Sequence, residues 1–365
     1  MDQNKEFDPK KAIEERKKEM EAITQKLEAG VKEIFNGENY KKYLKFCAKL
    51  PRYSVNNQIL IMLQKPDATA CQSFGAWKDM KRFVKKGEKG IRILAPSPFK
   101  IEKEQQKVDE SGKPVFDRNG QPVMEMVEVE VKAFKPVSTF DISQTDGEPV
   151  PTLGVEEIIG GVDGYETMLD AIKNSVPVPI SFEDIPSGAK GYYNVEENRI
   201  AVQEGMSETQ TIKTLLHEAS HAMLHSHEAR KNFGEKTKEQ MECEAESTAY
   251  VVCSHYGVDT SDYTFPYVAG WSSGKEVPEL KASLDTIRRA ASELITKIDE
   301  HLKAIDVIRD VDAFMEEHGD EIPFADPEPP KESILKKLKD GVTSGKGEGR
   351  PDIELGRKRD VAFAI

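Results

Sequence analysis

The sequence predicts an α+β protein with two domains, and three observations lead to this class. The 365 residues, 38% of them hydrophobic, suffice for two ordinary cores. Apolar residues recur at helical spacing over much of the chain, whereas short stretches alternate between apolar and charged residues, as strands do. A polar, Pro-rich stretch ends near residues 149–153. We therefore expect a charged helical lead-in at 1–34, a first domain at 35–150, a second at 151–305, and a linker with a disordered charged tail at 306–365.

Charge is distributed unevenly along the chain. Residues 41–100 contain 14 Lys or Arg and three acids, a balance of +11, so the rest of a chain with net charge −13 carries −24. A basic module is joined to an acidic one.

The composition also indicates a compartment. No run of eighteen apolar residues exists, and residues 1–7 lack the apolar core of a secretory signal. The four cysteines, at positions 47, 71, 243 and 253, form no CxxC pair. We expect a cytoplasmic protein with buried thiols and no membrane partner.

The first domain begins with two helical patterns and continues with strands. The helices span about 31–65 and break at Leu50-Pro51, with Ser54 as a plausible N-cap of the second. The apolar run 91–95 predicts a strand, and Asp117-Arg-Asn-Gly120 predicts a hairpin turn. Residues 127–133 alternate as an antiparallel strand does.

Basic residues in this domain are interleaved with aromatic and amide side chains. A single-stranded nucleic acid needs such a surface, because phosphates bind Lys and Arg and unpaired bases stack on flat rings. The candidates are Tyr53, Asn56, Asn57, Trp77, Arg82, Lys85, Lys86 and Lys89. The alternative is a solvated basic face with Tyr53 and Trp77 in the core.

The second domain opens with a helix at about 155–174, followed by strands at 176–182, 191–194 and 198–202. A strand directly before the next helix offers an edge to an extended peptide. A long amphipathic helix at 280–302 closes the domain. Tyr263 or Tyr267 is a candidate for stabilising an oxyanion, with an aromatic packing cluster as the alternative.

The stretch Thr214–His225 contains His217-Glu218-x-x-His221. Its helix begins with Ser207 as N-cap, and the two imidazoles project from one face about one turn, or roughly 6 Å, apart. Such a pair holds a zinc ion while the intervening Glu acts on a zinc-bound water. The alternative is an amphipathic helix with two exposed polar residues.

A catalytic zinc needs a third protein ligand. His227 has a suitable spacing, but Leu224 stands where a helix-ending glycine is required. A second helix, from Thr237 to about Gly257, offers Glu242 as ligand, with Glu246 one turn on as an acceptor from a zinc-bound histidine. Glu244 points away from both. A solvated acidic face is the alternative.

Four motifs of the first domain stand out: Tyr53-Ser-Val-Asn-Asn-Gln-Ile-Leu-Ile-Met62, Phe74-Gly-Ala-Trp77, Val84-Lys-Lys-Gly-Glu-Lys-Gly-Ile91 and Asp141-Ile-Ser-Gln-Thr145. Together with His217 to Glu246, they resemble the motifs of the ArdC-type antirestriction proteins of conjugative plasmids and transposons. The resemblance implies an N-terminal domain that binds single-stranded DNA and a zincin-like metallopeptidase domain distantly similar to the ImmA/IrrE peptidases. It further implies His217, His221 and Glu242 as metal ligands, Glu218 as general base, and Glu246 as the supporting acid.

The sequence and the resemblance together predict a single-stranded-DNA-binding protein of a mobile element that carries one Zn²⁺ per chain and cleaves a peptide or protein substrate. In this hypothesis Glu218 takes the proton of zinc-bound water and returns it to the leaving amine. Two alternatives stay open: a DNA-binding protection protein with a structural zinc, and a metallopeptidase whose N-terminal domain binds a protein.

Overall fold

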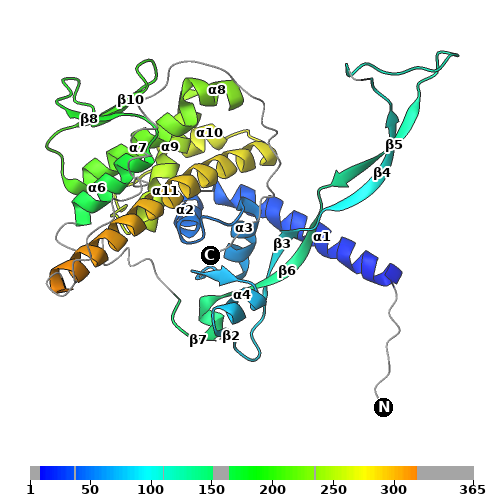
Figure 1. Cartoon of the computed structure of the whole chain (residues 1–365), viewed down its shortest axis with the longest axis horizontal. Helices are drawn as coiled ribbons and strands as arrows, with labels where there is room; N and C mark the ends of the chain where they lie inside the picture. Colours follow the sequence, from blue (N-terminus) through cyan, green and yellow to red (C-terminus); the bar gives the residue numbers. More distant parts are fainter. Residues whose placement is uncertain (1–8, 37, 110, 151–163, 234–235, 319–365) are drawn as a thin grey trace, which may run out of the picture. The chain divides into compact units, whose positions relative to one another are not determined.

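The computed structural model describes residues 9–36, 38–109, 111–150, 164–233 and 236–318. Residues 1–302 form one compact unit and residues 303–365 a second, of which helical residues up to 318 are described. The mixture of helices and antiparallel strands confirms the α+β class (Figure 1). The predicted disordered tail falls mostly on residues outside the described part.

The N-terminal half begins with helices. These are α1 (Pro9–Ile34), α2 (Asn39–Lys49), α3 (Val55–Gln64) and α4 (Phe74–Asp79). Ser54 caps α3 by accepting a hydrogen bond from the Asn57 N–H, as predicted. The last two turns of α1, the predicted charged lead-in, bury Val31 and Ile34 against the following helices.

Short sheets follow. The strands are β1 (Cys71–Gln72), β2 (Arg82–Val84), β3 (Ile91–Pro96), β4 (Phe99–Gln106), β5 (Met124–Val131), β6 (Phe134–Asp141) and β7 (Thr145–Gly147), with the short helix η1 (Ile142–Gln144) before β7. Strand β6 lies between β1 and β3, and β2 pairs with β7, all antiparallel. Strands β4 and β5 pair with each other as a two-stranded ribbon that extends away from the helices (Figure 1).

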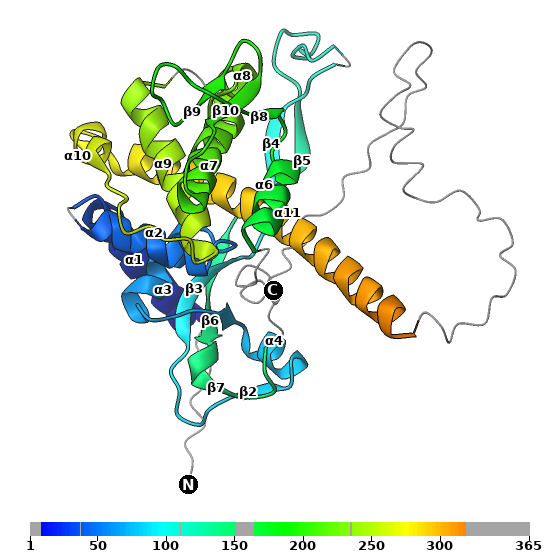
Figure 2. The same cartoon turned by 90° about the vertical axis from the view of Figure 1, so that its left-hand side faces the viewer.

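The C-terminal half places a three-stranded sheet beside a helical layer (Figure 2). Its elements are α6 (Gly164–Ser175), β8 (Ile180–Glu183), β9 (Gly191–Asn194), β10 (Arg199–Gln203), α7 (Glu208–His225), α8 (His227–Phe233), α9 (Lys238–His255), α10 (Pro266–Ser272) and α11 (Val277–His318). Strand β10 is central, parallel to β8 and antiparallel to β9, so β9 is an edge strand. The expectation that the strand directly before α7 offers its edge to a peptide is therefore wrong, because that strand is β10 and both of its edges are paired. The first part of the helix predicted at 155–174 lies outside the described residues.

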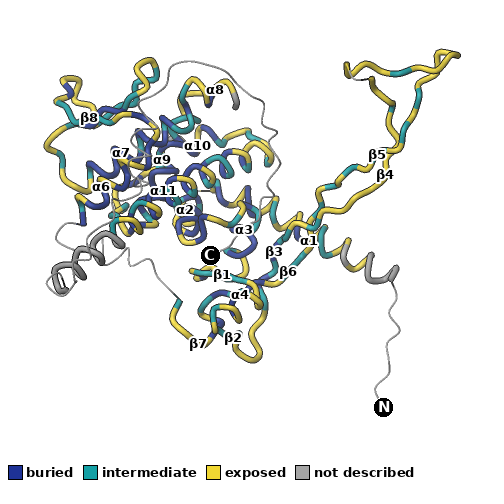
Figure 3. The backbone as a smooth tube through the Cα atoms, in the orientation of Figure 1, coloured by how far each residue is buried: buried dark blue, intermediate teal, exposed yellow. Residues whose placement is uncertain are grey.

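One hydrophobic core contains residues from both predicted domains (Figure 3). Tyr40, Tyr43 and Leu44 of α2 pack in the same cluster as Leu215 of α7 and Tyr250 of α9. A second, smaller cluster lies under β1 and β3. The predicted boundary near residues 149–153 thus does not separate two cores, and the division into 35–150 and 151–305 as independent domains stays a prediction.

Two expectations about the whole chain concern membranes and thiols. Within the described residues no helix is both long and apolar enough to span a bilayer. All four cysteines are free and buried, as predicted.

Candidate metal centre

Helix α7 presents the two histidines as the sequence predicted. Ser207 caps the helix by accepting a hydrogen bond from the Gln210 N–H. Leu215, Leu216 and Ala219 are fully buried, which fixes the opposite face of the helix against the core. The Nε2 atoms of His217 and His221 lie 3.1 Å apart.

Glu242 approaches these nitrogens from α9. That helix also begins as predicted, because Thr237 accepts a hydrogen bond from the Gln240 N–H. The Glu242 Oε2 atom lies 3.6 Å from His217 Nε2 and 3.7 Å from His221 Nε2. The three residues are the group, among those the structure describes, whose ligand atoms all lie within 4.8 Å of one another.

This donor set fits a divalent metal. Two nitrogens on one tetrahedral zinc, each at about 2.0–2.1 Å, lie about 3.3 Å apart, close to the 3.1 Å observed here. The adjacent His217 and His221 rings hold the pKa of Glu242 far below its ordinary value. Burial lowers the pKa of His217, but Glu242, Glu218 and Glu246 together raise it, which shows how much negative charge faces the two rings.

Glu218 lies beside the histidines with its carboxylate enclosed between α7 and β9. Burial raises its pKa, although His217, His221 and a hydrogen bond from the Tyr193 N–H oppose the shift. Gly191 permits this close packing, since a Cβ there would lie 2.6 Å from Thr214 Cγ2 and 3.3 Å from Glu218 Cγ. The general-base candidate is therefore held by the edge strand itself.

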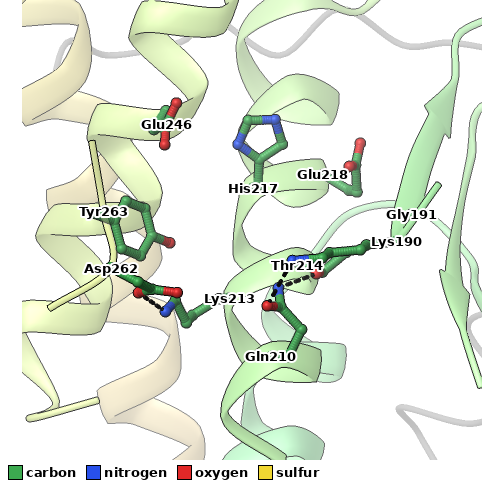
Figure 4. A pocket seen from close by; sticks show the side chains of 10 residues that line it. All are labelled: Lys190, Gly191, Gln210, Lys213, Thr214, His217, Glu218, Glu246, Asp262 and Tyr263. Carbon is green, nitrogen blue, oxygen red and sulfur yellow. Dashed lines mark hydrogen bonds and ion pairs between the residues drawn. The ribbon is translucent and has the colours of Figure 1, made fainter. Parts of the chain in front are cut away.

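A cavity of about 380 Å³ opens beside His217 and Glu218 (Figure 4), and a second cavity is lined by His217, His221 and Glu242. Figure 4 shows His217 and Glu218 on one wall and Glu246 and Tyr263 on the other. Glu246 thus faces the site, but none of the hydrogen bonds found in the described part joins it to a histidine. Its role as acceptor stays a prediction. Tyr263 packs against Tyr250 and Phe265, so it belongs to an aromatic cluster at the cavity wall.

Two residues of this centre, His225 and Glu244, were not predicted from the sequence. The His225 Nδ1 lies 3.0 Å from His221 Nδ1, and His225 Nε2 lies 3.2 Å from Glu244 Oε2. Glu244 does point away from Glu242 and Glu246, but it reaches the site from the other side through His225. The sequence signal was the third histidine at the same four-residue spacing. His227, as expected, lies elsewhere and pairs with Glu196.

The predicted DNA-binding residues fall into three sets: residues bound to the protein's own backbone, the buried Trp77, and the remaining residues. In the first, polar groups already bind the protein's own backbone: the Tyr53 hydroxyl donates to Cys71 O, and Asn57 exchanges two hydrogen bonds with Leu94. Arg82 donates to the carbonyls of Gly147 and Glu148. These contacts position β1, β3 and β7.

Trp77 requires a correction. Its side chain is 1% exposed and its Nε1–H donates to Phe140 O, so its ring is inaccessible to a base. The alternative of a core tryptophan is what the structure shows. The sequence analysis did not select the exposed rings of Phe74 and Phe83, which are 58% and 59% exposed.

The remaining candidates keep accessible groups. Lys86 and Lys89 are exposed, and Lys85 reaches Ser143 O and Asp146 from an exposed position. Asn56 is half-buried, and its Oδ1 is buried without a hydrogen-bond partner.

Two domain families match the chain. Residues 13–138 match the N-terminal domain of anti-restriction factor ArdC, and residues 175–254 match the IrrE N-terminal-like domain. The second match contains His217, His221 and Glu242 together.

Curated relatives match over longer stretches. An uncharacterized Bacillus anthracis protein, pXO2-81, is 27% identical over 330 residues, which cover 82% of this chain and 54% of that protein. The DNA primase TraC of Escherichia coli is 27% identical over 229 residues, 60% of this chain and 15% of the primase. The chain thus spans about half the length of the first relative and a small part of the second.

Among solved structures, the antirestriction ArdC protein from the R388 plasmid is similar in its metal-free and Mn(II)-bound forms. Identities are 21% and 19% and TM-scores 0.41 and 0.37, with 69% of this chain covered in each case and 85% and 88% of those chains. On the two domain matches, the expected resemblance to the ArdC-type proteins is confirmed, and the chain combines an ArdC N-terminal domain at 13–138 with an IrrE N-terminal-like domain at 175–254.

Proposed function

We propose that the chain is a metal-dependent peptidase joined to a module that binds single-stranded DNA. The observation that carries the first part is the convergence of His217, His221 and Glu242 beside the enclosed carboxylate of Glu218. Two imidazoles and one carboxylate leave an open coordination position, as catalytic sites require.

The metal proposed is one Zn²⁺ per chain. The R388 relative is described in a Mn(II)-bound form, so Mn²⁺ is the second choice. When bound, such an ion polarises a carbonyl and acidifies a water.

The chain's own residues then move the proton. The Glu218 carboxylate, oriented by the Tyr193 N–H, takes a proton from the attacking water and passes it to the leaving amine nitrogen. Its raised pKa brings this base closer to neutral pH, where proton uptake and release are both accessible.

The substrate proposed is an extended peptide along β9. This strand is at the edge of its sheet, and it borders Glu218. An added strand gains main-chain hydrogen bonds without needing a particular side-chain sequence.

The test compares Glu218→Gln, His217→Ala and the control Glu208→Gln, an exposed acid on the same helix. Bound zinc and cleavage of an unfolded casein substrate are measured together. We expect Glu218→Gln to keep zinc and lose cleavage by about 10²-fold or more, His217→Ala to lose both, and the control to keep both. Cleavage that survives Glu218→Gln refutes the base. Zinc without any cleavage in the wild type favours the structural-zinc alternative.

The N-terminal module is proposed to bind single-stranded DNA in the cytoplasm, the compartment that four free thiols fit. The match to the ArdC N-terminal domain supports this proposal. We revise the stacking residues to the exposed Phe74 and Phe83, and the phosphate-binding residues to Lys85, Lys86 and Lys89. In a mobile element, such binding would accompany protection of incoming DNA from restriction.

Fluorescence anisotropy with a labelled single-stranded oligonucleotide over a salt series tests this surface. The double change Lys85→Glu and Lys86→Glu is expected to weaken binding and flatten the salt dependence, and Phe83→Ala to cost about 1–3 kcal/mol. The double change Lys107→Glu and Lys113→Glu, at exposed positions between β4 and β5, is the charge-matched control. Equal loss in the control, or binding indifferent to salt, points to a protein partner instead.

A further inference from the structure

A group of three polar side chains adjoins the candidate metal centre, on the side of His221 that faces away from His217, and two of the three are buried. The His225 and Glu244 side chains are 3% and 1% exposed, and that of Lys236 is 12% exposed. Burial of this many polar groups is costly unless each one is hydrogen-bonded.

Each of them is hydrogen-bonded, and the bonds form a continuous series from Lys236 through Glu244 and His225 to His221. Lys236 Nζ lies 2.6 Å from Glu244 Oε2, and Gln240 Nε2 donates to Glu244 Oε1 at 3.1 Å. Glu244 Oε2 lies 3.2 Å from His225 Nε2, and His225 Nδ1 lies 3.0 Å from His221 Nδ1. The series ends at the ring whose other nitrogen faces Glu242 and His217.

The carboxylate at one end decides where the protons lie. Ionised Glu244 only accepts hydrogen bonds, so the Nε2 of His225 donates to it. In a neutral ring the Nδ1 of His225 is then an acceptor, and it receives the Nδ1–H of His221. The Nε2 of His221 is therefore left with its lone pair directed at the metal position.

We infer that His225, Glu244 and Lys236 are positioning residues that fix the tautomer and ring orientation of His221 for metal binding. A metal-binding histidine usually donates directly to a carboxylate or carbonyl. Here an imidazole stands between the ligand and the acid, and the acid comes from α9, the helix that also carries Glu242. The inference rests on the proposed metal site.

Zinc dissociation constants, measured by competition with a chromophoric chelator, test the inference. His225→Phe keeps the ring volume, removes the acceptor, and leaves Glu244 paired with Lys236. We expect zinc binding to weaken about 10- to 100-fold. Glu244→Gln is expected to weaken it less, and Glu239→Gln, an exposed acid on the same helix, to leave it unchanged.

The double variant separates positioning from mere packing. If Glu244 acts through His225, adding Glu244→Gln to His225→Phe causes no further loss of zinc affinity, because coupled residues are not additive. Independent, additive losses overturn the inference, as do folded variants that bind zinc like the wild type. Wild-type protein that binds no zinc refutes the proposed metal site itself, which is a distinguishable failure.

A spectroscopic measurement on the unaltered protein covers the case in which His225→Phe does not fold. Long-range ¹H–¹⁵N spectra of the zinc-loaded chain report which ring nitrogen carries hydrogen. We expect protonation of His225 at Nε2 and of His221 at Nδ1. The opposite tautomer of either ring overturns the inference.

Discussion

Gly191 lies where the edge strand β9 packs directly against helix α7. An added Cβ would lie 2.6 Å from Thr214 Cγ2 and 3.0 Å from Ala201 O. A contact below 3.0 Å forces the backbone or the neighbouring side chain to move. The neighbouring side chain here is that of Thr214, which lies about one helical turn before Glu218 on α7. We therefore expect a side chain at position 191 to displace Glu218, the proposed general base.

Gly191→Ala is expected to lower the free energy of unfolding by about 1–3 kcal/mol, as overpacking does. It should also reduce peptidase activity more than zinc affinity, because Glu218 moves and the ligands do not. Urea unfolding, zinc titration and cleavage measure the three effects. Gly270→Ala, where nothing lies within 4 Å, is the tolerant control. An unchanged stability for Gly191→Ala contradicts the packing described.

Asp141 illustrates a buried acid with a structural role. Burial raises its pKa, but hydrogen bonds from Ser143 and from the Thr69 and Ala70 N–H groups lower it below the ordinary 3.8. Because the pKa of Asp141 is lower in the folded state than the ordinary 3.8, its ionisation stabilises the fold at pH values above 3.8. This contribution is lost as the pH falls through the pKa that Asp141 has in the folded state.

Asp141→Asn is therefore expected to destabilise the protein by about 1–3 kcal/mol at neutral pH, and the difference from wild type should shrink toward about pH 3. Urea unfolding at the two pH values checks this. Asp146→Asn, whose side chain is 79% exposed, should change stability little at either pH. A difference that grows on acidification would contradict the sign.

At the scale of single residues, the sequence predicted those members of the candidate site that belong to a short motif. The His-Glu-x-x-His spacing places His217, Glu218 and His221 by helical geometry alone. Glu242 required a second helix, and its face could be worked out from periodicity. Glu244 was set aside because helical angles describe one helix, whereas its partner His225 lies on another.

At the scale of helices and strands, helix α9 connects the two halves of the chain. One side carries Glu242 and Glu246, which line neighbouring cavities, and an adjacent side meets α2. There the Tyr40 hydroxyl lies 2.8 Å from Ser247 Oγ and 3.6 Å from Cys243 Sγ. The side chains next to the metal ligand are thus held by a residue some two hundred positions earlier.

Tyr40→Phe should lower the free energy of unfolding by about 1–3 kcal/mol, because it leaves the fully buried Ser247 hydroxyl without this partner. Thermal and urea unfolding of the metal-free protein provide the measurement. Tyr193→Phe removes a hydroxyl that bonds Asn198 at an exposed site and should change stability by less than about 0.5 kcal/mol. Equal effects would mean that the α2–α9 contact is not specific.

Elements with local signals were predictable and their packing was not. The caps Ser54, Ser207 and Thr237 act as expected, because capping depends on neighbouring residues. Trp77 was misplaced because an aromatic ring among basic residues looks the same in sequence whether it faces solvent or core. Only tertiary contacts decide between the two.

At the scale of the whole molecule, the larger of the two hydrophobic cores is shared by both family matches. Helix α2 from the ArdC N-terminal match and helices α7 and α9 from the IrrE-like match bury their apolar faces together. Removal of either half would expose the apolar surface of the other.

We therefore expect one cooperative unfolding transition for the main body, with far-UV and near-UV circular dichroism coinciding. Zinc should shift this transition as a whole, since a ligand of the native state stabilises every part that unfolds with it. Two separate transitions, of which zinc moves one, would show that the halves fold independently.

The ribbon of β4 and β5 is expected to be less stable against local unfolding than this core. Within the described residues its strands pair with each other alone, and an isolated two-stranded ribbon is marginally stable in water. Its amides should exchange with deuterium long before those of α7 and α9, by local opening that leaves the body folded. At its base the Ser97 N–H donates to Ala133 O at 2.7 Å. A short turn joining these two residues would delete the ribbon without disturbing the body, which makes this segment the natural place for length variation between relatives.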